Sequence, residues 1–337
     1  MSAAAKQLLA STPLASVLPS NSLVTVTTGC RLEAAIKTLN EHNILSVPVL
    51  EQGEYHGCIS ANDVLKNLII ALNARKAHWL EAGASSFTAE ELVGVGKELA
   101  GKLVGELDHT GALYLLSAAT NTSMLDFVVN CFEIRDSHHV HHRVYVSAAS
   151  ATAHTTSEGG TTVVNATAAP TSGKLTVTHV VSHLDVVRLL AANKAALGGM
   201  AEQTLESLGL DEGAVFCVPA STPAIEAFAR MAIDEKSCLG LTEPTTGKLV
   251  GNLSASDLRG LTSPEAFASL LSPAADYQAA RHGGAAPLVG TVTPATTFGD
   301  LLDMLVGRKL HRVYVVDEAG KPTSIITLTD ILRLVSA

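Results

Sequence analysis

The chain has 337 residues, which is enough for two domains of ordinary size. Hydrophobic residues make up 47% of it and aromatic residues 4%, so its cores must be built mainly from Val, Leu, Ile and Ala. Acidic residues outnumber basic ones by 32 to 23, and the resulting net charge of −9 argues against a general nucleic-acid or anionic-membrane surface. Because no uninterrupted apolar run is long enough to cross a bilayer, we expect no membrane-spanning segment.

Four stretches of the chain repeat the same order of predicted elements. Each opens with a short β segment, at residues 23–26, 113–116, 215–218 and 288–292. A polar turn follows, and then a helix whose apolar residues recur at helical spacing, as Leu32, Ile36 and Leu39 do in the first copy. Two further strands are separated by a turn, and the second of them leads into a closing helix. Each stretch therefore predicts a β-α-β-β-α unit.

All four units close with the same phrase, a hydroxyl residue, two variable positions and an aspartate. The copies are Ser60–Asp63, Ser182–Asp185, Ser254–Asp257 and Thr327–Asp330. The last three aspartates are 72 and 73 residues apart, and a fixed phrase at a domain-sized period indicates a repeated structural unit. A hydroxyl and a carboxylate at a strand-to-helix junction can both turn toward one ligand, where the carboxylate accepts hydrogen bonds from a vicinal diol. The phrase therefore suggests a ribose site.

The first two units are farther apart, because Asp63 precedes Asp185 by 122 residues. An insert at about 148–173, rich in Ala, Thr, Ser and Gly, accounts for part of the excess, and we predict that it is disordered. The predicted boundaries are 12–78 for unit one, 79–107 for a linker, 108–197 for unit two, 210–275 for unit three and 285–337 for unit four. Units of this size bury little surface alone, so we expect them to pair through their sheets.

These features resemble the CBS (cystathionine β-synthase) domain, whose paired copies form a Bateman module. The set of four is similar to the gamma regulatory subunits of AMP-activated and SNF1-related protein kinases. The most specific matches are the segments 142–146 and 311–317, because a His-Arg pair opens the middle strand of the second and fourth copies in that family. The resemblance implies an α/β fold of four CBS domains, arranged as two Bateman modules in a pseudo-symmetric disc.

The resemblance also implies a site for AMP, ADP or ATP in the clefts between the repeats. The aspartates and their neighbouring hydroxyls would hold the ribose, and the His-Arg pairs would hold phosphate, which guanidinium binds in a bidentate fork. The implied ribose residues are Ser60, Asp63, Ser182, Asp185, Ser254, Asp257, Thr327, Thr329 and Asp330. The implied phosphate residues are His142, Arg143, His311 and Arg312.

Three positions depart from the family's pattern. Leu45 stands where the first copy of the family has a phosphate-binding Arg, and Leu184 stands where the second copy has a Lys. Asp185 replaces an Arg of the animal gamma subunits, and it could either bind ribose or simply cap the following helix. A purely structural scaffold whose clefts no longer bind ligands is therefore an alternative.

Other chemistry finds little support in the sequence. His138, His139, His141 and His142 are dense, but neighbouring residues on a strand point to opposite faces and no Cys or Glu stands at zinc spacing, so we predict no metal. The five cysteines are scattered without CxxC spacing, which predicts reduced thiols. No nucleophile stands beside a plausible base and orienting group, and we expect no catalysis.

The resulting hypothesis is a regulatory protein that senses adenine nucleotides and has no other cofactor. The resemblance implies two protein partners, a Ser/Thr kinase catalytic subunit and a scaffolding beta subunit, and we expect neither nucleic acid nor membrane as a partner. The alternative is a freestanding CBS protein that regulates another enzyme or a transporter through adenosine ligands. The N-terminal 22 residues contain one Lys and no Arg, so we expect the cytoplasm or the nucleus, with a plastid as the alternative.

Overall fold

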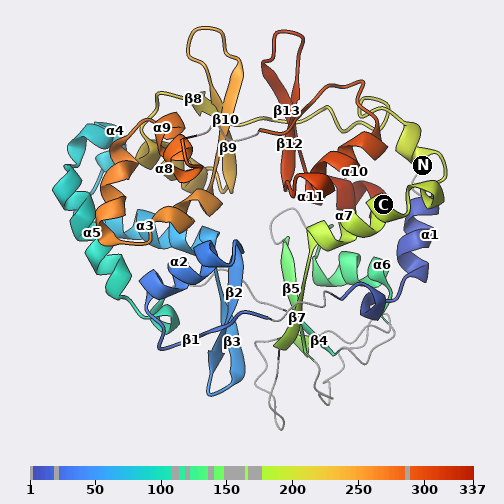
Figure 1. Cartoon of the computed structure of the whole chain (residues 1–337), viewed down its shortest axis with the longest axis horizontal. Helices are drawn as coiled ribbons and strands as arrows, with labels where there is room; N and C mark the ends of the chain where they lie inside the picture. Colours follow the sequence, from blue (N-terminus) through green and yellow to red (C-terminus); the bar gives the residue numbers. More distant parts are fainter. Residues whose placement is uncertain are drawn as a thin grey trace.

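The computed structural model describes residues 3–18, 23–107, 114–117, 122–135, 140–147, 164–165, 177–284 and 289–337. Four small β-sheets and their helices surround a common centre (Figure 1). We number the four β-α-β-β-α units one to four in chain order. In the view of Figure 1, the sheets of units one and two lie at the bottom and those of units three and four at the top.

Every unit places its middle strand between a parallel first strand and an antiparallel third strand. The strands are β1 (Val26–Thr27), β2 (Ser46–Glu51) and β3 (Glu54–Ser60) in unit one; β4 (Tyr114–Ser117), β5 (Arg143–Ser147) and β7 (Val177–Ser182) in unit two; β8 (Cys217–Pro219), β9 (Cys238–Thr242) and β10 (Leu249–Ser254) in unit three; and β11 (Thr291–Val292), β12 (Arg312–Val316) and β13 (Pro322–Thr327) in unit four. The predicted order of strands is therefore present four times.

Unit two carries one additional strand. β6 (Val164–Asn165) pairs antiparallel with β4, at the edge of a four-stranded sheet. These two residues belong to the insert that was predicted to be disordered, so the prediction differs from the structure at this point. The rest of the insert lies outside the described residues.

The helices follow the strands as predicted. The first helices are α2 (Leu32–Glu41), α6 (Met124–Asp126) continued by the π-helix η4 (Phe127–Cys131), α8 (Ala224–Ile233) and α10 (Phe298–Gly307); the second are α3 (Ala61–Arg75), α7 (His183–Ala192), the 3-10 helix η7 (Ala255–Gly260) and α11 (Leu328–Ser336). η7 is short because Gly260 and, soon after it, Pro264 both disfavour a continuing helix.

The turn after the first helix has the same unusual backbone in every unit. Asn43, Glu133, Glu235 and Lys309 occupy it with φ of 50, 51, 51 and 52°. Residues other than glycine seldom adopt positive φ, and four different positions share the value here. The left-handed turn is therefore a property of the repeated unit and not of one local sequence.

Two hydrophobic cores hold the four units together. The helices of units one and three share the first core, and those of units two and four share the second. Helices therefore join units across the molecule, whereas sheets join neighbours in sequence: Ser46 Oγ and Tyr145 OH are 3.1 Å apart between units one and two, and Tyr314 OH donates to Asn252 Oδ1 at 2.7 Å between units four and three. The predicted pairing through sheets is present, and the helical pairing adds to it.

The segment predicted as a linker is part of the first core. It forms α4 (Trp79–Ala82), η2 (Ala84–Ser86), α5 (Ala89–Gly101) and η3 (Val104–Glu106). α5 begins at a capping box in which Glu91 accepts from the backbone N–H of Thr88 and Thr88 Oγ1 accepts from that of Glu91. Its buried face packs on η8 (Pro264–Leu271) of unit three, so the connection between units one and two also joins units one and three.

The remaining helices complete the two halves. They are α1 (Ala3–Ser11), η1 (Leu14–Ser16), η5 (Lys194–Leu197), η6 (Met200–Glu202) and α9 (Ala274–Arg281). α1 packs against α6 and α11 in the second core. All five cysteines carry free thiols, and among the described helices none is long and apolar enough to cross a membrane.

Gly96 tests the contact between α5 and η8. A Cβ at Gly96 would stand 2.7 Å from the Phe267 ring and 2.8 Å from the Pro264 carbonyl oxygen. Alanine improves helix propensity by about 1 kcal/mol, but overpacking costs about 1–3 kcal/mol, so we expect Gly96→Ala to lower the free energy of unfolding in urea. Gly94→Ala is the matched control, because its Cβ meets the movable end of Arg75, and it should be neutral or stabilising. Equal effects of the two substitutions would contradict this packing.

Candidate functional site

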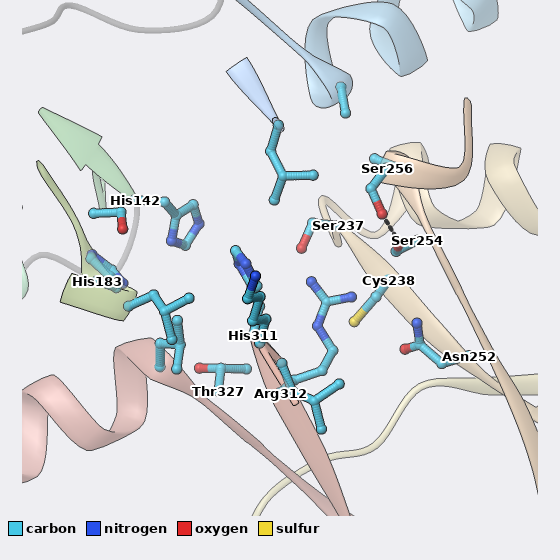
Figure 2. A pocket seen from close by; sticks show the side chains of 18 of the residues that line it. His142, His183, Ser237, Cys238, Asn252, Ser254, Ser256, His311, Arg312 and Thr327 are labelled. Carbon is cyan, nitrogen blue, oxygen red and sulfur yellow. Dashed lines mark hydrogen bonds between the residues drawn. The ribbon is translucent and has the colours of Figure 1, made fainter. Parts of the chain in front are cut away.

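The four units meet around a cavity of about 490 Å³, which lies within the range typical of small-molecule sites (Figure 2). Side chains from all four units line it. Its basic residues are Arg143, Arg188, Arg259, Lys309 and Arg312, with the histidines His142, His183 and His311. No Asp or Glu lines the cavity within the described part of the chain. In a protein of net charge −9, this concentration of cations is suited to a small anion.

Strand register brings the two His-Arg pairs to this cavity. Arg143 pairs with Ser182 and Arg312 with Thr327, the hydroxyl residue that opens the repeated phrase in each unit. In the other two units Ser46 pairs with Ser60, and Cys238 with Ser254. The position next to the phrase is therefore guanidinium in units two and four and neutral in units one and three.

The two His-Arg pairs lie close enough for each arginine to affect the pKa of both histidines. Burial lowers the pKa of His142 to about 4, and the charges of Arg143 and then Arg312 add to the effect. Burial lowers the pKa of His311 to about 3, again with Arg143 and Arg312 contributing. Although the His142 side chain is accessible from the cavity, protein atoms surround it deeply enough to disfavour its charged form. Near pH 7 both imidazoles are neutral and share the cavity wall with two charged guanidinium groups.

His183 is a site residue that the sequence analysis missed. It is 2% exposed, its Nε2 lies 3.0 Å from the His141 carbonyl oxygen, and its Nδ1 lies 3.4 Å from Thr329 Oγ1 in unit four. Since a carbonyl only accepts, Nε2 carries the proton and Nδ1 accepts from the threonine. Its ring packs edge-on against His142, with centroids 5.1 Å apart. His183 directly follows the hydroxyl of its phrase, where units one and three have Ala, and that difference was the available signal.

The hydroxyl–aspartate phrases form capping boxes. In each, the aspartate Oδ2 accepts from the backbone N–H of the hydroxyl residue at 2.7–2.8 Å and from its hydroxyl at 2.6–3.3 Å. The hydroxyl residue and the two residues after it line the cavity in all four units. The aspartates themselves do not belong to the cavity lining. For Asp185 the sequence left open whether it binds ribose or caps the following helix. All four aspartates cap the helices that follow them.

The four aspartates differ in how much of the carboxylate a ligand can reach. Asp63 is 0% exposed. Asp185 Oδ1 accepts from Arg188 Nη1 at 2.7 Å, and Asp257 Oδ1 lies 3.7 Å from His282 Nε2. Asp330 is half-buried, and no hydrogen bond reaches its Oδ1 from the described residues. Asp330 is thus the aspartate with most capacity to accept further hydrogen bonds.

The other predicted site residues are brought together. Ser60, Ser182, Ser254, Thr327 and Thr329 line the cavity along with the two His-Arg pairs. The two leucines that depart from the family's pattern, Leu45 and Leu184, also line it. Sequence reasoning missed three of the cavity's cations, Arg188, Arg259 and Lys309.

The histidine cluster does not gather ligands for a metal where it is described. His138 and His139 lie outside the described residues. Among all described residues, His141 and His142 included, no three His, Cys, Asp or Glu side chains are grouped so that they could hold a metal ion.

Comparison with known proteins identifies the repeated unit. A family model of the CBS domain matches residues 14–70 and 286–337. Units one and four are therefore CBS domains. A solved protein from Methanocaldococcus jannaschii, described as a proposed archaeal homologue of g-AMPK, superposes with a TM-score of 0.63 at 15% identity, covering 95% of this chain and 99% of that one. The expected α/β fold of CBS repeats is thereby confirmed.

Two curated Arabidopsis thaliana proteins are similar in sequence to parts of the chain. SNF1-related protein kinase regulatory subunit gamma-1-like is 32% identical over 117 residues, which are 32% of this chain and 26% of that protein. SNF1-related protein kinase regulatory subunit gamma-1 is 30% identical over 149 residues, or 40% and 35% of the two chains. The matched segments thus span about a quarter and a third of these relatives.

The depressed histidine pKa values predict a pH dependence of anion binding. An anion between His142 and His311 would favour their charged forms and raise both pKa values, so the bound state takes up protons. Linkage then requires affinity to rise as pH falls, and we expect inorganic tripolyphosphate to bind more tightly at about pH 6 than at about pH 8.

Without ligand, the unfolded chain binds more protons below pH 6.5, so stability should fall as pH drops from 6.5 toward 4.

Calorimetric titration of the wild type and of a His142→Gln/His311→Gln double variant measures the pH dependence of tripolyphosphate affinity. The protonation of tripolyphosphate itself contributes equally to both proteins, so the difference in pH slope belongs to the histidines. An unchanged slope in the double variant would exclude them as the source.

Proposed function

We propose that the chain is a non-catalytic regulatory subunit that senses adenine nucleotides for a Ser/Thr protein kinase. AMP, ADP and ATP would compete for the central cavity. Their differential binding would shift the conformation that the chain presents to a kinase catalytic subunit and a scaffolding beta subunit. The observation that carries this proposal is the convergence of two His-Arg pairs on one cavity that no described carboxylate lines.

The proposed pose follows from the charges along the cavity wall. Arg143 and Arg312 would bind phosphate oxygens through charge-assisted hydrogen bonds, and the neutral imidazoles beside them can donate to the same anion. The ribose would lie against unit four, where the Thr329 hydroxyl lines the cavity and the Asp330 Oδ1 can accept from a diol. The expected ribose roles of Asp63, Asp185 and Asp257 receive less support, because their carboxylates are buried or already hold other groups.

The proposed kinase partnership depends on the curated relatives. Both are SNF1-related kinase regulatory subunits by name, but the similarity covers only part of each protein. A freestanding CBS protein acting on another enzyme or a transporter is the rival. Location in the cytoplasm or nucleus belongs to the same proposal.

Calorimetry with AMP and adenosine tests the two halves of the pose separately. Arg312→Ala should weaken AMP far more than adenosine, because adenosine has no phosphate for the guanidinium to bind. Asp330→Ala should weaken both ligands by about 1–3 kcal/mol, since it leaves ribose hydroxyls unpaired. Asp300→Ala is the control for lost capping: Asp300 caps α10 with Thr297, and no residue of α10 lines the cavity, whereas Asp330 directly follows the cavity-lining Thr329, so Asp300→Ala should leave nucleotide affinity unchanged. Wild-type protein that binds neither AMP nor ATP would end the sensor proposal.

Affinity capture from native extract tests the partnership. With the whole chain as bait, we expect a Ser/Thr kinase catalytic subunit and its beta subunit to be retained. Retention of a different enzyme or transporter, with no kinase, would favour the freestanding protein.

A further inference from the structure

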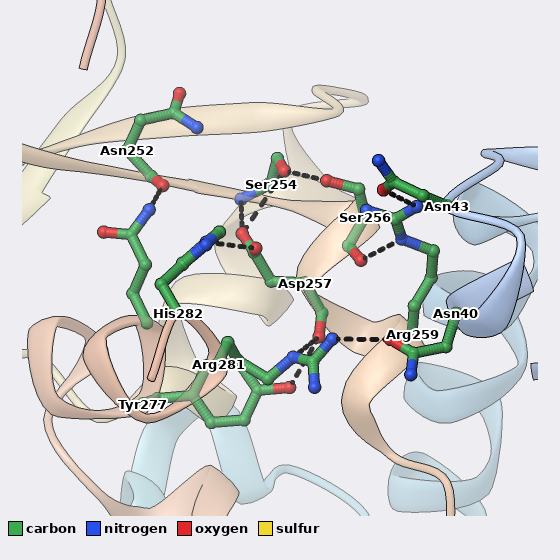
Figure 3. Close-up of polar contacts among 11 residues, drawn as sticks. Asn40, Asn43, Asn252, Ser254, Ser256, Asp257, Arg259, Tyr277, Arg281 and His282 are labelled. Carbon is green, nitrogen blue, oxygen red and sulfur yellow. Dashed lines mark hydrogen bonds and ion pairs between the residues drawn. The ribbon is translucent and has the colours of Figure 1, made fainter. Parts of the chain in front are cut away.

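Arg259 of unit three holds unit one while it also lines the central cavity. Its Nη1 donates to Asn43 Oδ1 at 3.0 Å and to the Ile44 carbonyl oxygen at 3.2 Å (Figure 3). Its Nε donates to the Ser256 carbonyl oxygen at 2.9 Å. The side chain is half-buried and belongs to the cavity lining, as Asn43 does. One guanidinium therefore serves an interface between units and faces a site for anions.

The contact on unit one is suited to a cation. Asn43 occupies the left-handed turn that ends α2, where the helix dipole leaves partial negative charge. A second guanidinium docks nearby, since Arg281 Nη2 donates to Asn40 Oδ1 at 3.1 Å. The acceptors that Arg259 uses on unit one are nevertheless neutral, an amide and a carbonyl. A phosphate oxygen is a stronger acceptor than either, because a charged acceptor strengthens the hydrogen bond.

Arg143 faces the same space from unit two. Burial lowers the pKa of Arg259, Asp257 opposes that effect, and the charges of Arg281 and Arg143 strengthen it. The guanidinium groups of Arg143 and Arg259 thus repel each other across a space without lining carboxylates. An anion placed between them would relieve this repulsion.

We propose that Arg259 is a further anion-binding residue of the cavity. Its guanidinium N–H groups would then be divided between the anion and the contact on unit one. This inference rests on the proposed function in that the anion is the polyphosphate of a nucleotide. An end-on bidentate fork on a phosphate, which uses Nη1 together with Nη2, would take an N–H from the contact with unit one, because Nη1 already donates to Asn43 and Ile44. Ligand binding and the clamp between units one and three then compete, and by linkage each weakens the other.

Unit four provides an internal comparison. Arg333 Nε donates to the Ile134 carbonyl oxygen of unit two at 3.0 Å, and Ile134 follows Glu133 in the same left-handed turn as Ile44 follows Asn43. Arg333 thus joins units two and four at the corresponding carbonyl oxygen, although through Nε and not Nη1. It is absent from the described cavity lining, so the competition should be confined to Arg259.

Because of this competition, substitutions on the two sides of the contact between Arg259 and Asn43 should change anion affinity in opposite directions. Titration of inorganic tripolyphosphate and of ATP into the whole chain at about pH 8, where the histidines are neutral, measures both. Arg259→Gln removes a charged donor and should weaken both anions by about tenfold. Asn43→Gly removes the competing acceptor, and because glycine adopts the φ of 50° readily, it should tighten both anions by about threefold. Arg333→Gln should leave both affinities within about twofold of wild type.

Wild-type affinity in Arg259→Gln would overturn the inference. So would a loss in Asn43→Gly equal to that in Arg259→Gln, because the clamp would then be merely structural. If Arg259→Gln does not fold, Asn43→Gly still decides the matter by the direction of its effect. Tripolyphosphate binding without ATP binding would refute the nucleotide proposal while leaving the role of Arg259 intact, whereas a wild type that binds neither anion would overturn both.

Discussion

The capping box at each strand-to-helix junction is the interaction on which the rest of the structure depends. An aspartate Oδ2 accepts from the backbone and the hydroxyl three residues earlier, and this fixes where the closing helix begins. With the aspartate held, the hydroxyl and the two residues between are presented to the cavity in every unit. The same hydroxyl residue pairs with the first position of the middle strand. A single local motif, repeated four times, thereby places twelve of the residues that line the centre.

The cavity lining differs in composition between the two pairs of units. Units one and three place neutral side chains around the centre, including Ala61, Ser254 and Cys238, with Arg259 as the one cation among the described lining residues of these two units. Units two and four place imidazole and guanidinium groups there, and the guanidinium charges disfavour protonation of His142 and His311. Like charges without lining carboxylates are unfavourable in a partly desolvated cavity, and the two hydrophobic cores outside it must offset that cost. This arrangement is physically reasonable where an anion is bound for part of the time.

Much of the fold could be predicted because its signals are local. Helical periodicity in Leu32–Leu39 and the phrase around Asp330 are short-range patterns, so the β-α-β-β-α units followed from them. Which helical faces meet is a long-range property, and nothing local indicated that unit one packs on unit three or that the segment around α5 joins their core. The aspartates were ambiguous for a physical reason, since one spacing suits both a cap and a diol. The role of His183 could not be predicted from local sequence because it depends on Thr329, 146 residues away.

A structure of the whole chain determined with ATP present would show whether the cavity between the four units binds the nucleotide. We expect phosphate density in the central cavity, within hydrogen-bonding distance of Arg143 and Arg312 together, with the ribose on the side of unit four. Well-defined nucleotide density at any other place on the molecule, with the cavity holding only water, would contradict it.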